Sequence, residues 1–164
     1  MLLYHGSDVI VEAPKILSPN RMLDFGAGFY TTTNKAQAVD FAHKVALRQS
    51  SSSRSVSVYD FDAGKAKNSL SVLEFKSADE EWLDFVYANR MGKVKTVNHD
   101  IVIGAVANDT VYRVFGLYEN GLIDKETALK QLKIQRLYDQ VVFCTEKALQ
   151  HLTFIDTLPP EEFN

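Results

Sequence analysis

The chain has 164 residues, of which 46% are hydrophobic and 24% charged, and its formal net charge is −3. These proportions are typical of an ordinary soluble globular protein, and the length suits a single domain spanning residues 1–164. A net negative charge argues against a protein that binds nucleic acids by general phosphate attraction. No apolar run approaches the roughly 20 residues of a membrane span, so we expect no membrane partner and a cytoplasmic location.

The cysteine and histidine content limits the chemistry further. Cys144 is the only cysteine, so it forms no intramolecular disulfide, which favours a reducing compartment. Its place in the apolar run QVVFCT predicts a buried structural thiol. No two of the four histidines have the i, i+4 spacing of a helical zinc site, and we expect no metal site.

The first third of the chain predicts a strand, a loop and a helix. Residues 1–5 (MLLYH) predict a short buried strand, and Pro14 and Pro19 exclude a helix from the segment that follows. The glycine-punctuated loop RMLDFGAGFYTTT leads to Asn34, which occupies an N-cap position before KAQAVDFAHKVALRQ. Five apolar residues have the spacing of an inner helical face. They are Ala38, Phe41, Ala42, Val45 and Ala46.

The rest of the chain intermixes strands and helices. SVSVYDFD (55–62) alternates as a half-buried strand does, and Ser77 with Glu80 predicts a capping box that opens a helix over 77–90. The remaining predicted elements are an apolar strand at 100–107, helices at 110–118 and 123–133 (the latter capped by Asp124), a strand at 139–145, a short helix at 146–152 and a frayed tail at 158–164. Without a regular βαβ alternation, this order predicts a mixed α+β sheet core.

His5 and Tyr30 are the residues that suggest a binding site. His5 ends an apolar strand, and Gly6 after it permits the backbone to approach a flat ligand closely. Each residue alone is more often a packing residue. Together, with glycines flanking the aromatic residue and a capped helix behind it, they favour a site. The GAG of residues 26–28 is not a dinucleotide fingerprint, because the run continues as a strand and does not open a helix.

These stretches resemble a known superfamily. YHGS (4–7) resembles the His-Gly-Ser motif of poly(ADP-ribose) polymerases and diphtheria-type toxins, and DFGAGFYTTTNKAQAVDFA (24–42) is similar to their second motif. GFYTT, DIVIGAVAND and QVVFCTEKAL are similar to stretches of a bacterial group within the ADP-ribosyltransferase superfamily that is described as a domain of unknown function. The resemblance implies an α+β fold with a split, mostly antiparallel sheet and flanking helices.

The resemblance also implies roles for residues in NAD binding. His5 would hydrogen-bond a ribose hydroxyl, and the Gly6 peptide would bind the nicotinamide carboxamide. Tyr30 would stack on the nicotinamide ring. The further positions in contact with NAD would be Ser7 at a ribose, Arg21 at the pyrophosphate, Gly28 in the second motif, and Phe41 as a second stacking aromatic.

In the third motif, LYDQVVFCT places Gln140 where the superfamily has a glutamate that holds the 2′-hydroxyl of the nicotinamide ribose. A glutamine amide can bind the same hydroxyl but cannot act as a base. Asp139 is adjacent, but in a strand it points to the opposite face. Gln140 is also compatible with an ordinary polar residue at the start of a strand.

The implied function is that of an NAD-dependent mono-ADP-ribosyltransferase without a metal. Its acceptor would be a macromolecule, protein or nucleic acid. The resemblance suggests the toxin of a toxin–antitoxin pair, with an antitoxin protein as partner, or a phage-defence factor. Two alternatives stay open: an NAD- or ADP-ribose-binding module without turnover, and a structural domain in which His5 and Tyr30 only pack.

Overall fold

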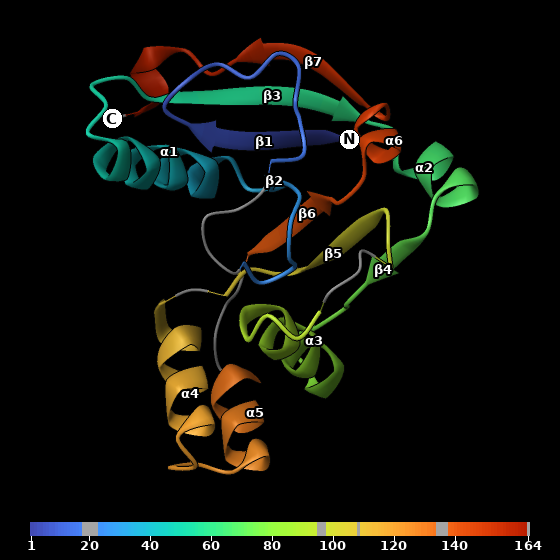
Figure 1. Ribbon diagram of the computed structural model, residues 1–164. Helices are drawn as coiled ribbons and strands as arrows, with labels where there is room; N and C mark the ends of the chain where they lie inside the picture. The colour runs from blue at the N-terminus through green and yellow to red at the C-terminus, as the bar shows by residue number, and fades with distance from the viewer. Residues whose placement is uncertain (18–22, 95–97, 108, 134–137, 164) are drawn as a thin grey trace.

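The computed structural model describes residues 1–17, 23–94, 98–107, 109–133 and 138–163. The described chain forms two sheets and six α-helices (Figure 1). One helix lies against the first sheet and another against the second, while a pair of helices projects at the far end from the first sheet. The predicted α+β class, with a split and mostly antiparallel sheet, is confirmed.

The first sheet has the order β1 (Leu2–Ser7), β3 (Ser55–Phe61), β7 (Leu152–Thr157), with antiparallel neighbours. The predicted strands at 1–5 and 55–62 are confirmed, but β3 is buried at every residue except Asp60. It is the central strand, with α1 (Lys35–Gln49) on one side and the second sheet on the other, so both of its faces are covered.

The second sheet has the order β2 (Phe29–Thr31), β6 (Asp139–Phe143), β5 (Ile101–Ala105), β4 (Val72–Glu74). Its pairs are antiparallel except for β4 and β5, which are parallel. The strands predicted within 100–107 and 139–145 are confirmed. The short strand β4 and the helix α2 (Ala63–Ser69) before it were not predicted.

The helix boundaries follow their capping residues. Asn34 accepts a hydrogen bond from the Gln37 amide at 2.9 Å, which confirms it as the cap of α1. The predicted capping box of α3 (Glu80–Arg90) is wrong, because Asp79 caps the helix through the Trp82 amide and Ser77 donates to Asp79 instead. The other helices are α4 (Asp109–Glu119), α5 (Lys125–Lys133), which begins at the predicted cap Asp124, and α6 (Glu146–Leu149).

The C-terminal segment differs from the prediction. The short helix α6 ends at Leu149, and the chain continues into β7, which pairs with β3. The predicted frayed tail is also wrong. Residues Pro160–Phe163 form a 3₁₀ turn, and Phe163 is buried against Ala38 and Ala42 of α1. Burial of this aromatic ring holds the tail on the helix.

Strand pairing gives the second sheet two distinct faces. Phe29, Val141 and Phe143 lie on the inter-sheet face, where they pack with Leu3 and Tyr59 of the first sheet. Tyr30, Gln140 and Val142 alternate onto the other face, called here the α3 face, where the core contains Trp82, Leu83 and Val86 of α3. The layers are therefore α1, first sheet, second sheet and α3.

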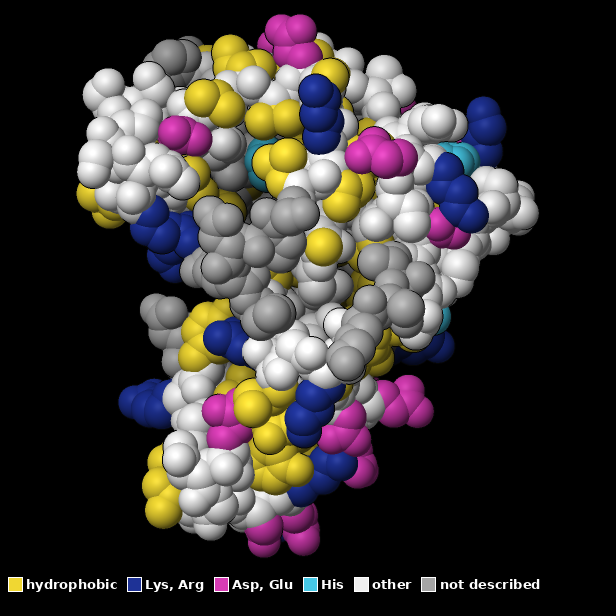
Figure 2. All heavy atoms as spheres, viewed as in Figure 1, with side chains coloured by type: hydrophobic (Ala, Val, Ile, Leu, Met, Phe, Trp, Pro, Cys, Tyr) yellow, Lys and Arg dark blue, Asp and Glu magenta, His cyan; other side chains and the backbone are white. Residues whose placement is uncertain are grey.

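The distribution of surface charges and the burial of the Cys144 thiol agree with what the sequence indicated. On the face shown in Figure 2, lysine and arginine side chains are interspersed with acidic ones. None of the described helices combines the length and the apolarity needed to cross a bilayer. Cys144 is buried, and burial, with the charge of Asp100, raises the pKa of its thiol to about 11. The prediction that the thiol is buried is confirmed.

Candidate functional site

Among the described residues, the two sheets are joined by a main-chain bridge between Tyr4 of β1 and Thr32, the residue that follows β2. The Tyr4 amide donates to the Thr32 carbonyl at 2.9 Å, and the Thr32 amide donates to the Tyr4 carbonyl at 3.0 Å. In the described chain no further strand pairing joins this edge of β1 to a neighbour. His5 and Gly6 follow immediately after the bridge, so both lie where the two strands separate.

His5 bridges this separation with its side chain. Its Nδ1 lies 2.7 Å from the Tyr30 carbonyl oxygen, and since a carbonyl only accepts, Nδ1 carries the proton. Burial lowers the pKa of His5, although the hydrogen bond to Tyr30 opposes that shift. The ring is therefore neutral at physiological pH, with Nε2 as a hydrogen-bond acceptor. Phe29 packs against the imidazole with ring centroids 4.3 Å apart, which places His5 on the inter-sheet side.

The peptide of Gly6 faces the unpaired edge of β1. The Phe61 amide donates to the Met1 carbonyl, so residues 1, 3, 5 and 7 direct their main-chain groups toward β3. Tyr4 and Gly6 direct theirs the other way, as the bridge of Tyr4 to Thr32 shows. The N–H and C=O of Gly6 are thus presented side by side at an edge that no described strand covers.

The same glycine is also required for packing. A Cβ at Gly6 would lie 2.1 Å from the Ala38 carbonyl oxygen and 2.8 Å from the Ala42 nitrogen, both in the backbone of α1. Only a residue without a side chain lets the helix approach β1 this closely. The glycine after His5 therefore has a structural reason that does not depend on a ligand.

Tyr30 contributes its carbonyl to His5, but its phenol points to the α3 face. The hydroxyl donates to the Gly26 carbonyl at 2.7 Å and accepts from the Phe25 amide at 3.1 Å. Burial raises the pKa of the phenol above its ordinary value, so it is a neutral donor. The ring packs against the core on the α3 face, and its hydroxyl ties down the loop before β2.

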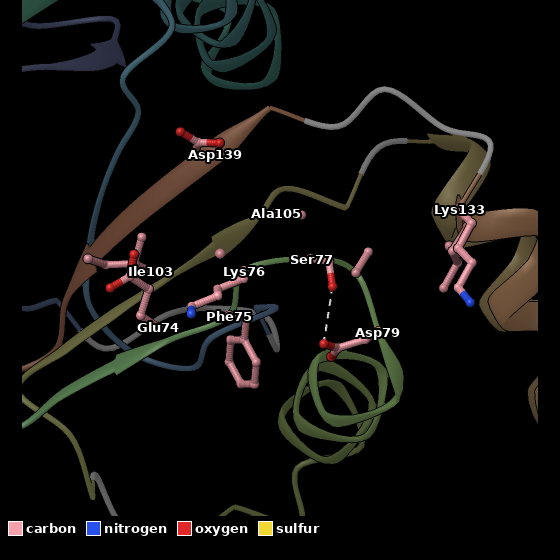
Figure 3. A pocket seen from close by; sticks show the side chains of 12 residues that line it. Glu74, Phe75, Lys76, Ser77, Asp79, Ile103, Ala105, Lys133 and Asp139 are labelled. Atoms are coloured by element: carbon pink, nitrogen blue, oxygen red, sulfur yellow. Dashed lines mark hydrogen bonds between the residues drawn. The ribbon is translucent and has the colours of Figure 1, made fainter.

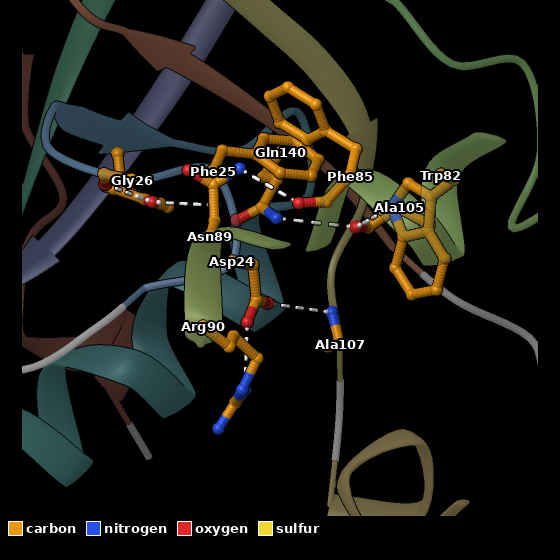
Figure 4. A network of polar contacts seen from close by, with 11 residues as sticks. Asp24, Phe25, Gly26, Trp82, Phe85, Asn89, Arg90, Ala105, Ala107 and Gln140 are labelled. Carbon is orange, nitrogen blue, oxygen red and sulfur yellow. Dashed lines mark hydrogen bonds and ion pairs between the residues drawn. The ribbon is translucent and has the colours of Figure 1, made fainter. Parts of the chain in front are cut away.

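Gln140 lies on the α3 face as well. It is 5% exposed, and its Nε2 donates to the Ala105 carbonyl at 3.3 Å. The same carbonyl accepts from Trp82 Nε1 at 3.1 Å, and Figure 4 shows both groups converging on it. The amide is thus engaged beneath α3, whereas the His5 imidazole lies on the inter-sheet side. The structure joins His5 to the main chain of Tyr30 and does not join it to the side chains of Tyr30 or Gln140.

Asp139 is the acidic group that reasoning from the sequence set aside. It is exposed, and strand alternation places it on the inter-sheet face with Val141 and Phe143. Thr33 Oγ1 donates to its Oδ2 at 3.1 Å. The alternation was readable from the sequence, but the face that His5 occupies was not, because it depends on how the two sheets pack.

Ser7 and Gly28, which were also predicted to contact NAD, both have contacts within the protein. The Ser7 hydroxyl donates to the carboxylate of Asp8 at 3.3 Å. A Cβ at Gly28 would lie 2.6 Å from Val142 Cγ1 and 2.8 Å from the Phe143 carbonyl oxygen, so glycine is needed for β2 to pair with β6. Arg21 lies outside the described residues.

Phe41 does not belong to the inner face of α1, and that part of the prediction is wrong. It is 41% exposed, with the Arg48 guanidinium 5.4 Å from its ring centroid. The buried face of the helix consists of Ala38, Ala42 and Ala46. The close approach of the helix to Gly6 leaves room for methyl groups but not for an aromatic ring.

The structure describes two cavities near these residues. One, of about 570 Å³, lies at the ends of β4 and β5 and is lined by Asp139, Ala105 and residues 74–79 (Figure 3). The other, of about 640 Å³, lies at the end of the first sheet and is lined by Asp8, Arg54 and Phe163 among others. His5, Gly6, Tyr30 and Gln140 line neither of them.

An ion pair between the buried Asp24 and the partly exposed Arg90 supports the loop before β2. Asp24 accepts from Arg90 Nη1 at 3.0 Å and from the Ala107 amide at 3.4 Å (Figure 4). Burial raises the pKa of Asp24, although the positive charge of Arg90 opposes that shift. The Arg90 guanidinium also lies 4.0 Å from the ring centroid of Tyr112. This network ties the loop to α3 and α4, and no pattern in the sequence indicated it.

Comparison with known proteins identifies a family but no activity. A family model described as "Protein of unknown function (DUF3990)" matches residues 1–154. A search of curated proteins found no match to the chain. Any role assigned to these residues therefore rests on their geometry and chemistry.

Proposed function

The chain belongs to the DUF3990 family, and from its own residues we propose that it is an NAD-dependent mono-ADP-ribosyltransferase. The observation that carries the proposal is the pairing of a neutral His5 with the peptide of Gly6, a buried residue whose N–H and C=O are directed to the unpaired edge of β1. These two groups offer complementary partners to the two parts of a nicotinamide riboside, its carboxamide and its ribose hydroxyls.

The Gly6 peptide matches a carboxamide. A carboxamide has one carbonyl acceptor and an amino donor, and the peptide offers one N–H and one C=O on the same side of the strand. His5 Nε2, held as an acceptor by the Nδ1 bond to Tyr30, suits a ribose hydroxyl. The Tyr30 carbonyl thus fixes both the tautomer and the orientation of the imidazole.

The chemistry proposed for this site is cleavage of the bond between nicotinamide and ribose. As that bond breaks, positive charge moves from the pyridinium ring to the ribose, and groups held in fixed positions stabilise the change better than mobile water does. His5 and Gly6 hold the two halves of the nicotinamide riboside on either side of the bond. The ADP-ribose then passes to a macromolecular acceptor, protein or nucleic acid. The toxin role and an antitoxin partner remain proposals that follow from the resemblance.

A second candidate is an NAD- or ADP-ribose-binding module without turnover. One observation favours it: the amide of Gln140, expected at the ribose, is buried and donates to Ala105. Such a module would use His5 and Gly6 in the same way, but it would release no nicotinamide.

Thermal unfolding with and without NAD, combined with nicotinamide release in a cell extract, tests both candidates. A ligand at 100 times its Kd stabilises the folded state by about 2.7 kcal/mol. For a chain of this length that corresponds to a rise of roughly 5–10 °C in Tm. We expect this rise in the wild type and its loss in His5→Ala. His151→Ala is the matched control and retains the rise.

The outcomes are distinct. A rise in Tm with nicotinamide release and labelling of an extract component supports the transferase. A rise in Tm without release supports the binding module. An unchanged Tm for the wild type at millimolar NAD would contradict both.

A further inference from the structure

The pairing of β2 with β6 settles which acidic or amide group shares a face with His5. Phe29 is paired with Phe143, and Thr31 with Val141, so the next position on that face of β6 is Asp139. His5 packs against Phe29, on this same face. Gln140 points into the core beneath α3. Asp139, and not Gln140, is on the side of the sheet where His5 lies.

Thr32 connects the main chain of Asp139 with that of Tyr4, the residue before His5. Its amide donates to the carbonyl of Tyr4, the residue before His5, and its hydroxyl donates to the carbonyl of Asp139 at 2.8 Å. Since β2 lies between β1 and β6, His5 and Asp139 are two strand spacings apart across the sheet and two residues apart along it, which together give roughly 12 Å.

Within the described residues, only one of the two carboxylate oxygens of Asp139 accepts a hydrogen bond. Oδ2 accepts from Thr33 Oγ1 at 3.1 Å, and no described residue donates to Oδ1. The side chain is exposed, and together with Ser77 and Asp79 it lines the cavity shown in Figure 3. One oxygen is therefore fixed by a neighbour while the other is available to a ligand.

A cavity adjoins Asp139 on the side away from His5. Sheet order places β5 and β4 beyond β6, and the cavity of about 570 Å³ lies at their ends, with Asp139 in its wall. That volume is in the range of small-molecule sites, about 300–1,000 Å³. Asp139 thus lies between the proposed nicotinamide site and a space large enough for one acceptor side chain or small molecule.

We propose that Asp139 is the catalytic carboxylate of this site, accepting the proton of the nucleophile that enters through the adjoining cavity. In the step, the oxygen or nitrogen of the nucleophile bonds to C1′ of the ribose while the bond from C1′ to nicotinamide breaks. Nicotinamide leaves with the electron pair of that bond, and the nucleophile's proton moves to an oxygen of Asp139. The inference rests on the proposed function.

NAD hydrolysis provides the test, because water serves as the nucleophile and no acceptor has to be known. The variants are Asp139→Asn, Asp139→Glu and Gln140→Met, with Asp40→Asn, an exposed position on α1, as the matched control. Nicotinamide release gives kcat and KM, and the NAD-induced rise in Tm reports binding separately.

We expect Asp139→Asn to lower kcat by about 10²–10⁴-fold, the usual contribution of a general base, while it keeps the NAD-induced rise in Tm. Asp139→Glu should restore part of the rate.

Equal hydrolysis by the wild type and Asp139→Asn, or loss of hydrolysis in folded Gln140→Met with full activity in Asp139→Asn, would overturn this inference and leave the proposed function standing. NAD-induced stabilisation of the wild type without any hydrolysis would also overturn it and would support the binding module. A wild type that NAD does not stabilise would remove the proposed function together with the inference.

Discussion

Replacing Gly6 by alanine tests the packing at the centre of the candidate site. The added methyl carbon would lie 2.1 Å from the Ala38 carbonyl oxygen and 2.8 Å from the Ala42 nitrogen. Ordinary contacts of this kind are about 3.4 Å or longer, so α1 has to retreat by more than 1 Å along the direction of the methyl group. Both contacted atoms belong to the helix backbone, so no side-chain rotation relieves the overlap. Overpacking of this kind costs about 1–3 kcal/mol, which lowers Tm by roughly 2–12 °C in a chain of this length.

Urea unfolding followed by the fluorescence of Trp82 measures this cost. Trp82 is the only tryptophan and is fully buried, so its emission reports loss of the core. The matched control is Gly116→Ala, in the interior of α4, where a Cβ meets nothing within 4 Å. There alanine should stabilise the protein by about 0.5–1 kcal/mol, because it has the higher helix propensity. A Gly6→Ala midpoint equal to that of the wild type would show that α1 does not approach β1 as closely as described.

Two further predictions concern buried groups. Arg90→Met should destabilise the protein more at pH 7 than at pH 4, as measured by urea unfolding at both pH values. The pKa of Asp24 is raised in the folded state, so protonation of this carboxyl favours folding at low pH, and this stabilisation is lost as the pH rises above the ordinary carboxyl range. Removing the positive charge of Arg90 raises that pKa further, so the ionised Asp24 costs more stability at pH 7. An equal loss at both pH values would contradict this account. Cys144 should react with a thiol reagent only as fast as the protein unfolds, because burial raises its pKa to about 11; rapid stoichiometric labelling of the native protein would contradict it.

Sequence patterns such as capping residues predicted the helix ends that depend on contacts within a few residues. Asn34 marks the start of α1 because its side chain satisfies an amide of the first turn, a contact within three residues. Ser77 failed as a cap because Asp79, two residues later, makes the same kind of contact and its carboxylate is a strong acceptor. Competition between two neighbouring capping residues is decided by the path of the loop, which the sequence pattern does not contain.

Elements that depend on distant partners were missed or placed on the wrong face. The strand β7 exists because it completes the first sheet beside β3, almost 100 residues earlier in the chain. Phe41 satisfied the helical spacing of an inner face, but the inner face is set by the contact of α1 with Gly6, more than 30 residues away. Periodicity identifies a helix, whereas the width of its buried face depends on what it packs against.

In the candidate site, too, local features could be predicted from the sequence and long-range contacts could not. The sequence predicted that the side chains of His5 and Tyr30 lie together, whereas the structure joins the His5 imidazole only to the Tyr30 carbonyl and places the phenol on the other face of the sheet. The sequence did not show which of the two side chains, Asp139 or Gln140, lies on the same side of the second sheet as His5. That assignment requires the register of β2 on β6 and the packing of the first sheet on the second, both of which are non-local.

Close packing of α1 and the proposed ligand binding can both explain why residue 6 is a glycine. The helix packs where a side chain would project, whereas the proposed ligand would contact the peptide groups at the strand edge. In a strand the side-chain direction is perpendicular to the sheet, whereas the peptide N–H and C=O lie in its plane. The helix α1 occupies the first direction, at Ala38 and Ala42. The second direction points to the unpaired edge. For the proposed NAD binding this helix contact would be favourable, since it holds the edge peptide in place. A change at Gly6 perturbs both directions at once, so binding can be separated from packing only through His5 and Asp139, whose side chains lie outside the contact of α1 with β1.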